Sequence, residues 1–263
     1  MNIILHADDF GYDKDTTEAT IELLQGGYLS SASIMANMPC TKEACQYASA
    51  HPEKSFGVHL TYVDELSPCC NPDEIVSLVN TSGRFLMADE TLKRALSFRL
   101  RVNDIVKESC AQIDKLKNAG VKISHLDSHG HLHKYPSFQM ALSTICKKTG
   151  INKVRRSQNV FIEKQIFGPR KILRSCLNLG IVMRFKSTDY FFMSANGFHT
   201  GWSEALCSQL NALPANSTIE IGVHPGIHSC GEESYRVNEY NDIIEFVKLI
   251  KHSNHKIINW NNI

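Results

Sequence analysis

The chain has 263 residues, of which 43% are apolar and 21% charged, and its formal net charge is +1. These values are typical of a globular protein with a sizeable core, and they argue against nucleic-acid binding through a strongly basic surface. No apolar run approaches the ~20 residues that a membrane-spanning helix needs, so we expect no membrane segment.

The cysteines and the N-terminal residues bear on the cellular compartment of the protein. The nine cysteines are scattered and form no CxxC pair, which disfavours a zinc ribbon. The chain opens on an apolar run at residues 3–5, without the basic region and apolar stretch of a secretory signal. We therefore expect reduced thiols in a cytoplasmic protein.

Short apolar runs alternate with longer segments of helical periodicity along the chain. The candidate strands, in chain order, are 2–7, 31–36, 55–60, 122–127, 152–156, 183–188, 218–223 and 255–259. The helical patterns are 15–26, 103–119, 137–149, 170–179 and 239–251, most of which stop at a glycine. Strand–helix repetition of this kind predicts a mostly parallel sheet.

About eight such units predict an α/β fold, a distorted (β/α) TIM-like barrel, with an open doubly wound sheet as the alternative. A single domain over residues 1–263 is the simplest organisation, because no linker rich in Pro, Gly or Ser interrupts the chain. Residues 62–100 break the alternation and carry Pro68, Pro72 and Gly83. We expect an inserted excursion there, of the kind that can cover a site.

Polar motifs accompany four of the predicted strands. The clearest is segment 125–133 (HLDSHGHLH), with four histidines and one aspartate in nine residues. Histidine and aspartate are preferred ligands of borderline divalent cations. The other motifs are 6–11 (HADDFG), 57–60 (GVHL) and 220–226 (EIGVHPG). Because the carboxyl ends of parallel strands share one face, we expect the four motifs to converge on one site.

Each motif has a plainer interpretation when it is taken alone. Asp8 and Asp9 could form a turn and cap a helix, although adjacent carboxylates repel each other unless a cation or a shared proton relieves them. His59 could be an ordinary core histidine, and His224 could belong to a simple turn. The alternating histidines of segment 125–133 have few such explanations, so the metal-site hypothesis depends mainly on them.

In combination, the motifs resemble those of the YdjC-like carbohydrate deacetylases, a family that includes the chitooligosaccharide deacetylases. Their order and approximate spacing match over about residues 2–250. The matching segments are 7–11, 57–60, 125–133 and 224–226. The resemblance implies a distorted (β/α) barrel, often a homodimer, that hydrolyses the N-acetyl group of an acetylated amino sugar or oligosaccharide.

The resemblance also implies a metal site and two catalytic residues. One divalent metal ion, Mg or Zn, would be held by Asp9, His59 and His129. Asp8 would be the general base that deprotonates water, and His224 the general acid that protonates the leaving amine. Such chemistry needs a polarised carbonyl, an activated water molecule and a proton donor near neutral pH.

Three further residues would support these groups. By the same resemblance, His125, Asp127 and His131 would contact the substrate or lie behind the metal ligands. Asp127 could accept the second ring N–H of a ligating histidine and fix its tautomer.

Other functions stay open from the residues alone. Aspartate with two histidines is also the facial triad of mononuclear iron oxygenases, which usually use an antiparallel barrel. A phosphoester hydrolase would need more basic residues near the motifs than Arg155 and Arg156. A non-catalytic sugar- or metal-binding module would use exposed aromatic rings, although core packing is their commoner role. The candidate rings are Tyr12, Tyr62, Phe198 and Trp202.

Overall fold

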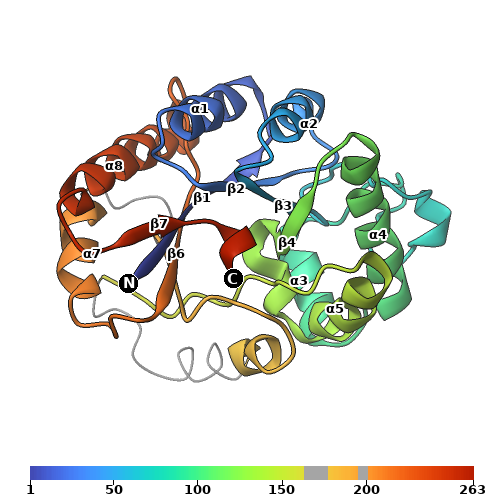
Figure 1. Cartoon of the computed structure of the whole chain (residues 1–263). Helices are drawn as coiled ribbons and strands as arrows, with labels where there is room; N and C mark the ends of the chain where they lie inside the picture. The colour runs from blue at the N-terminus through green and yellow to red at the C-terminus, as the bar shows by residue number, and fades with distance from the viewer. Residues whose placement is uncertain (163–176, 195–200) are drawn as a thin grey trace.

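A parallel sheet curls into a half-barrel with helices around it (Figure 1). The computed structural model describes residues 1–162, 177–194 and 201–263. The strands are β1 (Asn2–Phe10), β2 (Ser31–Ile34), β3 (Ser55–Leu60), β4 (Ile123–Ser128), β5 (Tyr190–Met193), β6 (Thr218–Val223) and β7 (Lys256–Ile258). They lie in the order β4-β3-β2-β1-β6-β5, and β7 pairs with β1.

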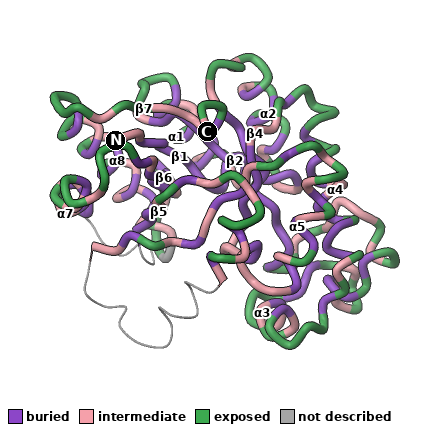
Figure 2. The backbone as a smooth tube through the Cα atoms, turned by 60° about the horizontal axis from the view of Figure 1, so that its bottom comes forward, coloured by how far each residue is buried: buried purple, intermediate pink, exposed green. Residues whose placement is uncertain are grey.

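The α-helices cover the outside of the sheet. They are α1 (Lys14–Gln25), α2 (Thr41–Ala50), α3 (Ala88–Leu96), α4 (Val102–Asn118), α5 (Pro136–Thr149), α7 (Trp202–Leu210) and α8 (Tyr235–Ile250). Short 3₁₀ segments are η1 (Pro72–Glu74), η2 (His129–Lys134), η4 (Gly231–Glu233) and η5 (Trp260–Asn262). Figure 2 shows the strands buried inside and the outer helix faces exposed.

Strand β1 organises the sheet. It pairs in parallel with β2, β6 and β7, and its residues from Ile3 onward are buried. A strand covered on both faces reads as a nearly continuous apolar run, which explains residues 3–5. One continuous apolar cluster joins this strand to its neighbours and to the helices, so the described residues form a single domain.

Local capping explains where two predicted helices begin and end. Helix α1 starts after Asp13, whose side chain accepts a hydrogen bond from the Thr16 backbone N–H at 2.7 Å. Helix α5 ends at Gly150, which has a φ of 77° and donates its N–H to the Cys146 carbonyl. That left-handed conformation suits glycine, which lacks a Cβ atom.

The distorted barrel is confirmed, but two of its expected strands are wrong. Residues 152–156 and 183–188 contribute only isolated bridges, Leu126 to Val154 and Lys153 to Lys186. The strand β5 lies later, in the apolar run at 190–193. Residues 177–182 are helical and Met183 is 75% exposed, so the apolar residues near 183 belong to a helix end. The expected helix 170–179 falls largely outside the described residues.

The segment expected as an excursion, 62–100, contains η1, α3 and an antiparallel bridge between Val79 and Phe85. It is anchored by buried residues such as Ile75 and Phe85, and Tyr62 packs on the ring of Phe138 from α5. Among the described residues, no helix is long and apolar enough to cross a bilayer.

Candidate active site

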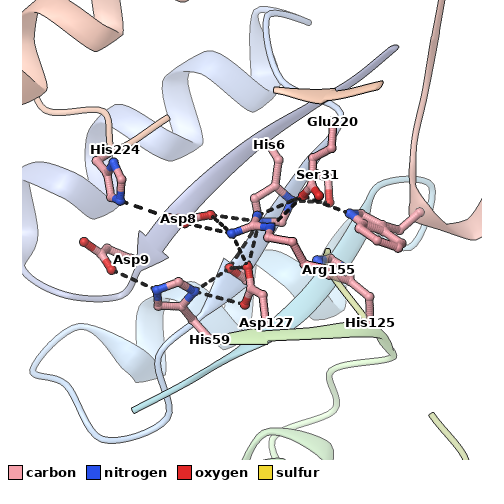
Figure 3. A network of polar contacts seen from close by, with 12 residues as sticks. His6, Asp8, Asp9, Ser31, His59, His125, Asp127, Arg155, Glu220 and His224 are labelled. Carbon is pink, nitrogen blue, oxygen red and sulfur yellow. Dashed lines mark hydrogen bonds and ion pairs between the residues drawn. The ribbon is translucent and has the colours of Figure 1, made fainter. Parts of the chain in front are cut away.

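The polar motifs converge at the carboxyl ends of the strands, as expected. Asp8 and Asp9 lie at the end of β1, and His59 lies near the end of β3. Asp127 is the second-last residue of β4, which leads into η2, and His224 directly follows β6. Figure 3 shows these side chains turned toward one another from separate strands.

Asp9, His59 and His129 form the group that we call the outer cluster. Asp9 Oδ1 lies 3.2 Å from His59 Nε2 and 2.9 Å from His129 Nδ1. One donor atom from each residue lies within 4.8 Å of the other two, a spacing that can hold a metal ion. Burial pushes the pKa of Asp9 upward, but His129 and His59 outweigh it and hold the pKa well below its usual range.

An irregularity in β1 directs Asp9 into this cluster. Neighbouring side chains in a regular strand point to opposite faces, so Asp9 should point away from Asp8 and the barrel interior. The pairing register of β1 with β2 shifts between Ala7 and Phe10, and Asp9 has a φ of 58°. Bulges of this kind re-aim side chains and are common beside active sites.

The ring of His59 is oriented from behind. Its Nδ1 lies 3.0 Å from Asp127 Oδ1 and 3.0 Å from Ser33 Oγ, which leaves Nε2 facing Asp9. Burial alone would lower the pKa of His59, but Asp127, Asp8 and Asp9 raise it to about 10. The carboxylates around this imidazole therefore favour positive charge at this position. A bound cation can supply that charge while it displaces the proton.

The strand that carries His59 also needs a glycine, Gly57, in order to pack against its neighbour. A Cβ atom at Gly57 would lie 2.5 Å from His125 Nε2, so only glycine lets β3 approach the buried His125 ring. This contact explains the glycine that precedes Val58 and His59 in the motif.

Behind the outer cluster lies a second group, the inner cluster, formed by His6, Asp8, Asp127, Arg155 and Glu220. Arg155 is fully buried, and its Nη1 lies 2.8 Å from Asp8 Oδ1 and 2.7 Å from Asp127 Oδ2. Its Nη2 lies 2.8 Å from Glu220 Oε1. Burial raises the pKa of Glu220 to about 7, against the opposing effect of Arg155. One guanidinium therefore joins carboxylates from three strands.

His125 lies deep in the barrel on the side of the inner cluster away from Asp9 (Figure 3). Its ring stacks on Trp260 with 4.5 Å between centroids, and burial lowers its pKa to about 3. Among the described residues, no hydrogen bond or ion pair joins it to Asp9 or His129. His131 is half-buried with a φ of 53°, and its ring packs against Phe191 at 5.8 Å.

His224 is held from α8. Glu239 Oε2 accepts the His224 backbone N–H at 2.5 Å and lies 3.2 Å from His224 Nδ1. The other ring nitrogen, Nε2, lies 3.9 Å from Asp8 Oδ2. Burial lowers the pKa of His224, but Glu239 and then Asp9 and Asp8 outweigh this and raise it. The carboxylates therefore extend to higher pH the range over which His224 is protonated.

The groups of residues that could hold a metal ion differ in how their carboxylates are paired. Besides the outer cluster, His6, Asp8 and Asp127 form one group with suitable spacing, and His6, His125 and Glu220 form another. Both of these deeper groups contain carboxylates already paired with Arg155. In the outer cluster, Arg236 pairs with Oδ2 of Asp9 and leaves Oδ1 facing the two imidazoles, so this cluster is better suited to a further cation.

The sequence placed Arg155 near the motifs without indicating its carboxylate partners, and it did not single out Arg236 or Glu239. Arg236 Nη2 donates to Asp9 Oδ2 at 3.0 Å. The sequence gives a weak indication that Arg155 is buried, because it follows the apolar Val154. It gives a similar indication for Arg236 and Glu239, which share a face of α8 at i, i+3 spacing. None of these patterns indicates a partner, because each partner lies on a distant strand or loop.

Comparisons with known proteins agree with this architecture. The chain is 38% identical over 135 residues to a carbohydrate deacetylase of Geobacillus stearothermophilus, which covers 51% of each chain. It is 26% identical over 271 residues to a carbohydrate deacetylase of Clostridium beijerinckii, with 100% of both chains covered. The matches to the first three curated relatives span only 51–52% of those proteins' lengths.

A solved structure supports the fold. A candidate cellobiose-phosphate cleavage protein of Enterococcus faecalis V583 superposes with a TM-score of 0.81 and 20% identity, over 99% of this chain and 98% of that one. The profile described as YdjC-like protein matches residues 2–254, nearly the whole chain. The chain therefore belongs to the YdjC-like family.

Proposed function

We propose that this protein is a metal-dependent hydrolase that removes the N-acetyl group from an acetylated amino sugar or oligosaccharide. The observation that carries the proposal is the outer cluster, flanked by Asp8 on one strand and His224 on another. Relatives named carbohydrate deacetylase support the substrate class.

The outer cluster fits a divalent ion. Asp9, His59 and His129 supply one oxygen and two nitrogen donors, a set that suits zinc, whereas magnesium prefers oxygen. Asp127 accepts from His59 Nδ1, as carboxylates behind metal-bound histidines commonly do. When bound, such an ion would polarise the acetyl carbonyl and make water a stronger acid.

Asp8 is placed to act as the general base. The Arg155 guanidinium fixes its carboxylate, and its Oδ2 faces His224 Nε2 at 3.9 Å. A carboxylate held in this way can accept a proton from water as the water attacks the acetyl carbon. Arg155 thereby orients the base.

His224 is placed to act as the general acid. Glu239 outweighs the effect of burial and raises its pKa, which extends to higher pH the range over which the ring holds a proton that it can donate to the leaving nitrogen. The same carboxylate holds both the backbone and the ring of His224, which limits the directions in which Nε2 can point.

The three remaining candidates receive different roles in this proposal. Asp127 orients His59. His125 is a core residue packed on Trp260 rather than a substrate contact. His131, half-buried and close in sequence to His129, is proposed to contact the substrate. The homodimer and the cytoplasmic location stay predictions.

The contacts disfavour the alternative functions. Arg155 already pairs with three carboxylates, so it is not free to bind a phosphoester. Of the rings considered for a sugar-binding module, Tyr62 and Trp202 are buried in the core. Tyr12 contacts Arg236, and Phe198 lies outside the described residues.

The proposal is tested by measuring metal content and acetate release on the same sample. We expect about one zinc or magnesium ion per chain, and acetate release from some members of a panel of N-acetylated mono- and oligosaccharides. Chelation should abolish the release, and added metal should restore it. Metal-loaded protein that releases no acetate from any substrate would refute a deacetylase.

The ligand assignment has its own test. His59→Ala and His129→Ala should each lose the bound metal, because each removes one of three donors. His252→Ala, which alters an exposed histidine beyond α8, is the matched control and should keep the metal. Parental metal affinity in both ligand variants would show that the assignment is wrong.

A further inference from the structure

Arg236, near the start of α8, contacts the metal-ligand candidate Asp9 at the carboxylate oxygen that does not face the histidines. Arg236 is only 2% exposed, although arginine is rarely buried without a specific partner. Its Nη2 donates to Asp9 Oδ2 at 3.0 Å. The proposed catalytic roles do not use this residue.

The two oxygens of Asp9 have separate partners. Oδ1 faces the ring nitrogens of His59 and His129, at 3.2 and 2.9 Å. Oδ2 is occupied by Arg236. A carboxylate held at one oxygen by a charge-assisted hydrogen bond cannot easily rotate to present both oxygens to the same cation.

The guanidinium is itself held firmly. Its Cζ lies 5.2 Å from the ring centre of Tyr12 and 5.5 Å from that of Tyr235, within the range of cation–π contacts. Its Nε lies 3.6 Å from Glu233 Oε2, an ion pair slightly too long for a hydrogen bond. Two rings and one carboxylate therefore position the donor that reaches Asp9.

The remaining hydrogen-bonding capacity of Arg236 favours a specific role. Within the described ranges, neither Nε nor Nη1 has a hydrogen-bond partner, although both are buried. An arginine that only holds the fold together would normally satisfy its donors with backbone carbonyls. Among the described residues, Asp9 is the one side-chain hydrogen-bond partner of this guanidinium.

We propose that Arg236 is a positioning residue that makes Asp9 a ligand through Oδ1 alone. The inference rests on the metal site of the proposed function, but not on the identity of the substrate. A bidentate carboxylate would take an additional coordination position. Restricting Asp9 to one oxygen keeps positions open for water and the acetyl oxygen, as catalytic metal sites require.

The test uses Arg236→Met, which removes the donor but keeps a long apolar side chain, and Arg236→Lys, which keeps the charge and one donor. We expect zinc affinity to fall about 10- to 100-fold in Arg236→Met, as is typical when a hydrogen bond to a ligand is lost. Arg236→Lys should recover part of it. The matched control is Arg94→Met, which alters a half-exposed arginine of α3.

Two further readouts separate a positioning role from a folding defect. The visible spectrum of the cobalt-substituted protein should become weaker in Arg236→Met if Asp9 turns bidentate and raises the coordination number. Thermal unfolding without metal shows whether the variant is folded. Unchanged affinity and an unchanged cobalt spectrum in folded Arg236→Met would overturn the inference. A parent protein that binds no metal would instead refute the proposed function.

Discussion

The inner and outer clusters both combine aspartate with histidine, but their buried charges are balanced differently. In the inner cluster, Asp8, Asp127 and Glu220 surround the buried guanidinium of Arg155, so the chain supplies its own cation. In the outer cluster, Arg236 reaches only Oδ2 of Asp9, and Oδ1 faces two imidazoles rather than a Lys or Arg side chain of the described residues. Charge pairing thus distinguishes a structural cluster from one suited to an external ion.

The difference between the two clusters begins with the adjacent residues Asp8 and Asp9, whose side chains point in different directions. Asp8 points into the barrel toward Arg155, whereas the left-handed backbone at Asp9 redirects the next carboxylate to His59 and His129. A regular strand could not place both carboxylates beside one reaction centre, because alternate side chains point to opposite faces. The bulge at the end of β1 is therefore what places a base next to a ligand.

The largest expected effect comes from Asp8, the inner-cluster residue that we propose as the general base. Asp8→Asn keeps the shape of the side chain but removes the proton acceptor, so acetate release should fall by roughly 10²- to 10⁴-fold. The metal content should stay at the parental level, because Asp8 is not among the ligands. Rate and metal content are measured on the same sample, with exposed Asp114→Asn of α4 as control. Near-parental turnover in Asp8→Asn would remove Asp8 as the base.

The next effect concerns the stability of the inner cluster. Arg155→Met leaves three buried carboxylates without their cation and should cost about 3–5 kcal/mol in the free energy of unfolding. The half-exposed Arg94, paired with Glu90 at 2.7 Å, provides the control. Arg94→Met should cost far less, because solvent screens such pairs. Urea unfolding of both variants measures the difference, and equal losses would mean that Arg155 is not the cation on which the cluster depends.

The same contrast explains how much could be predicted from the sequence. The convergence of Asp9, His59 and His129 was predictable, because the motifs stand where predicted strands end and parallel strands end at one face. Arg155 was not, since its role is set by Asp8, 147 residues away, and by carboxylates on other strands. A single buried arginine leaves no periodic pattern in the chain.

The fold shows a similar division. Strands with a continuous apolar run, such as β1 and β6, were predictable because burial on both faces leaves a clear signal. The strand β5 was misplaced by several residues, because the apolar residues near 183 end a helix while the aromatic run at 190–193 pairs with β6. Short apolar runs fit either a helix or a strand, and only the pairing with neighbouring strands decides between the two.

The smallest expected effect concerns the carboxylate behind His224. Glu239 raises the pKa of His224, and a general acid works only while it is protonated, so activity should fall as the pH rises through that pKa. Glu239→Gln keeps an oxygen that can accept the His224 backbone N–H, but it removes the negative charge. The pKa of His224 should therefore drop, and the alkaline limb of the kcat/KM profile should move to lower pH while metal affinity stays unchanged. If that limb keeps its position, the ionisation that it reports does not belong to His224. The proton donor would then have to be sought elsewhere around the outer cluster.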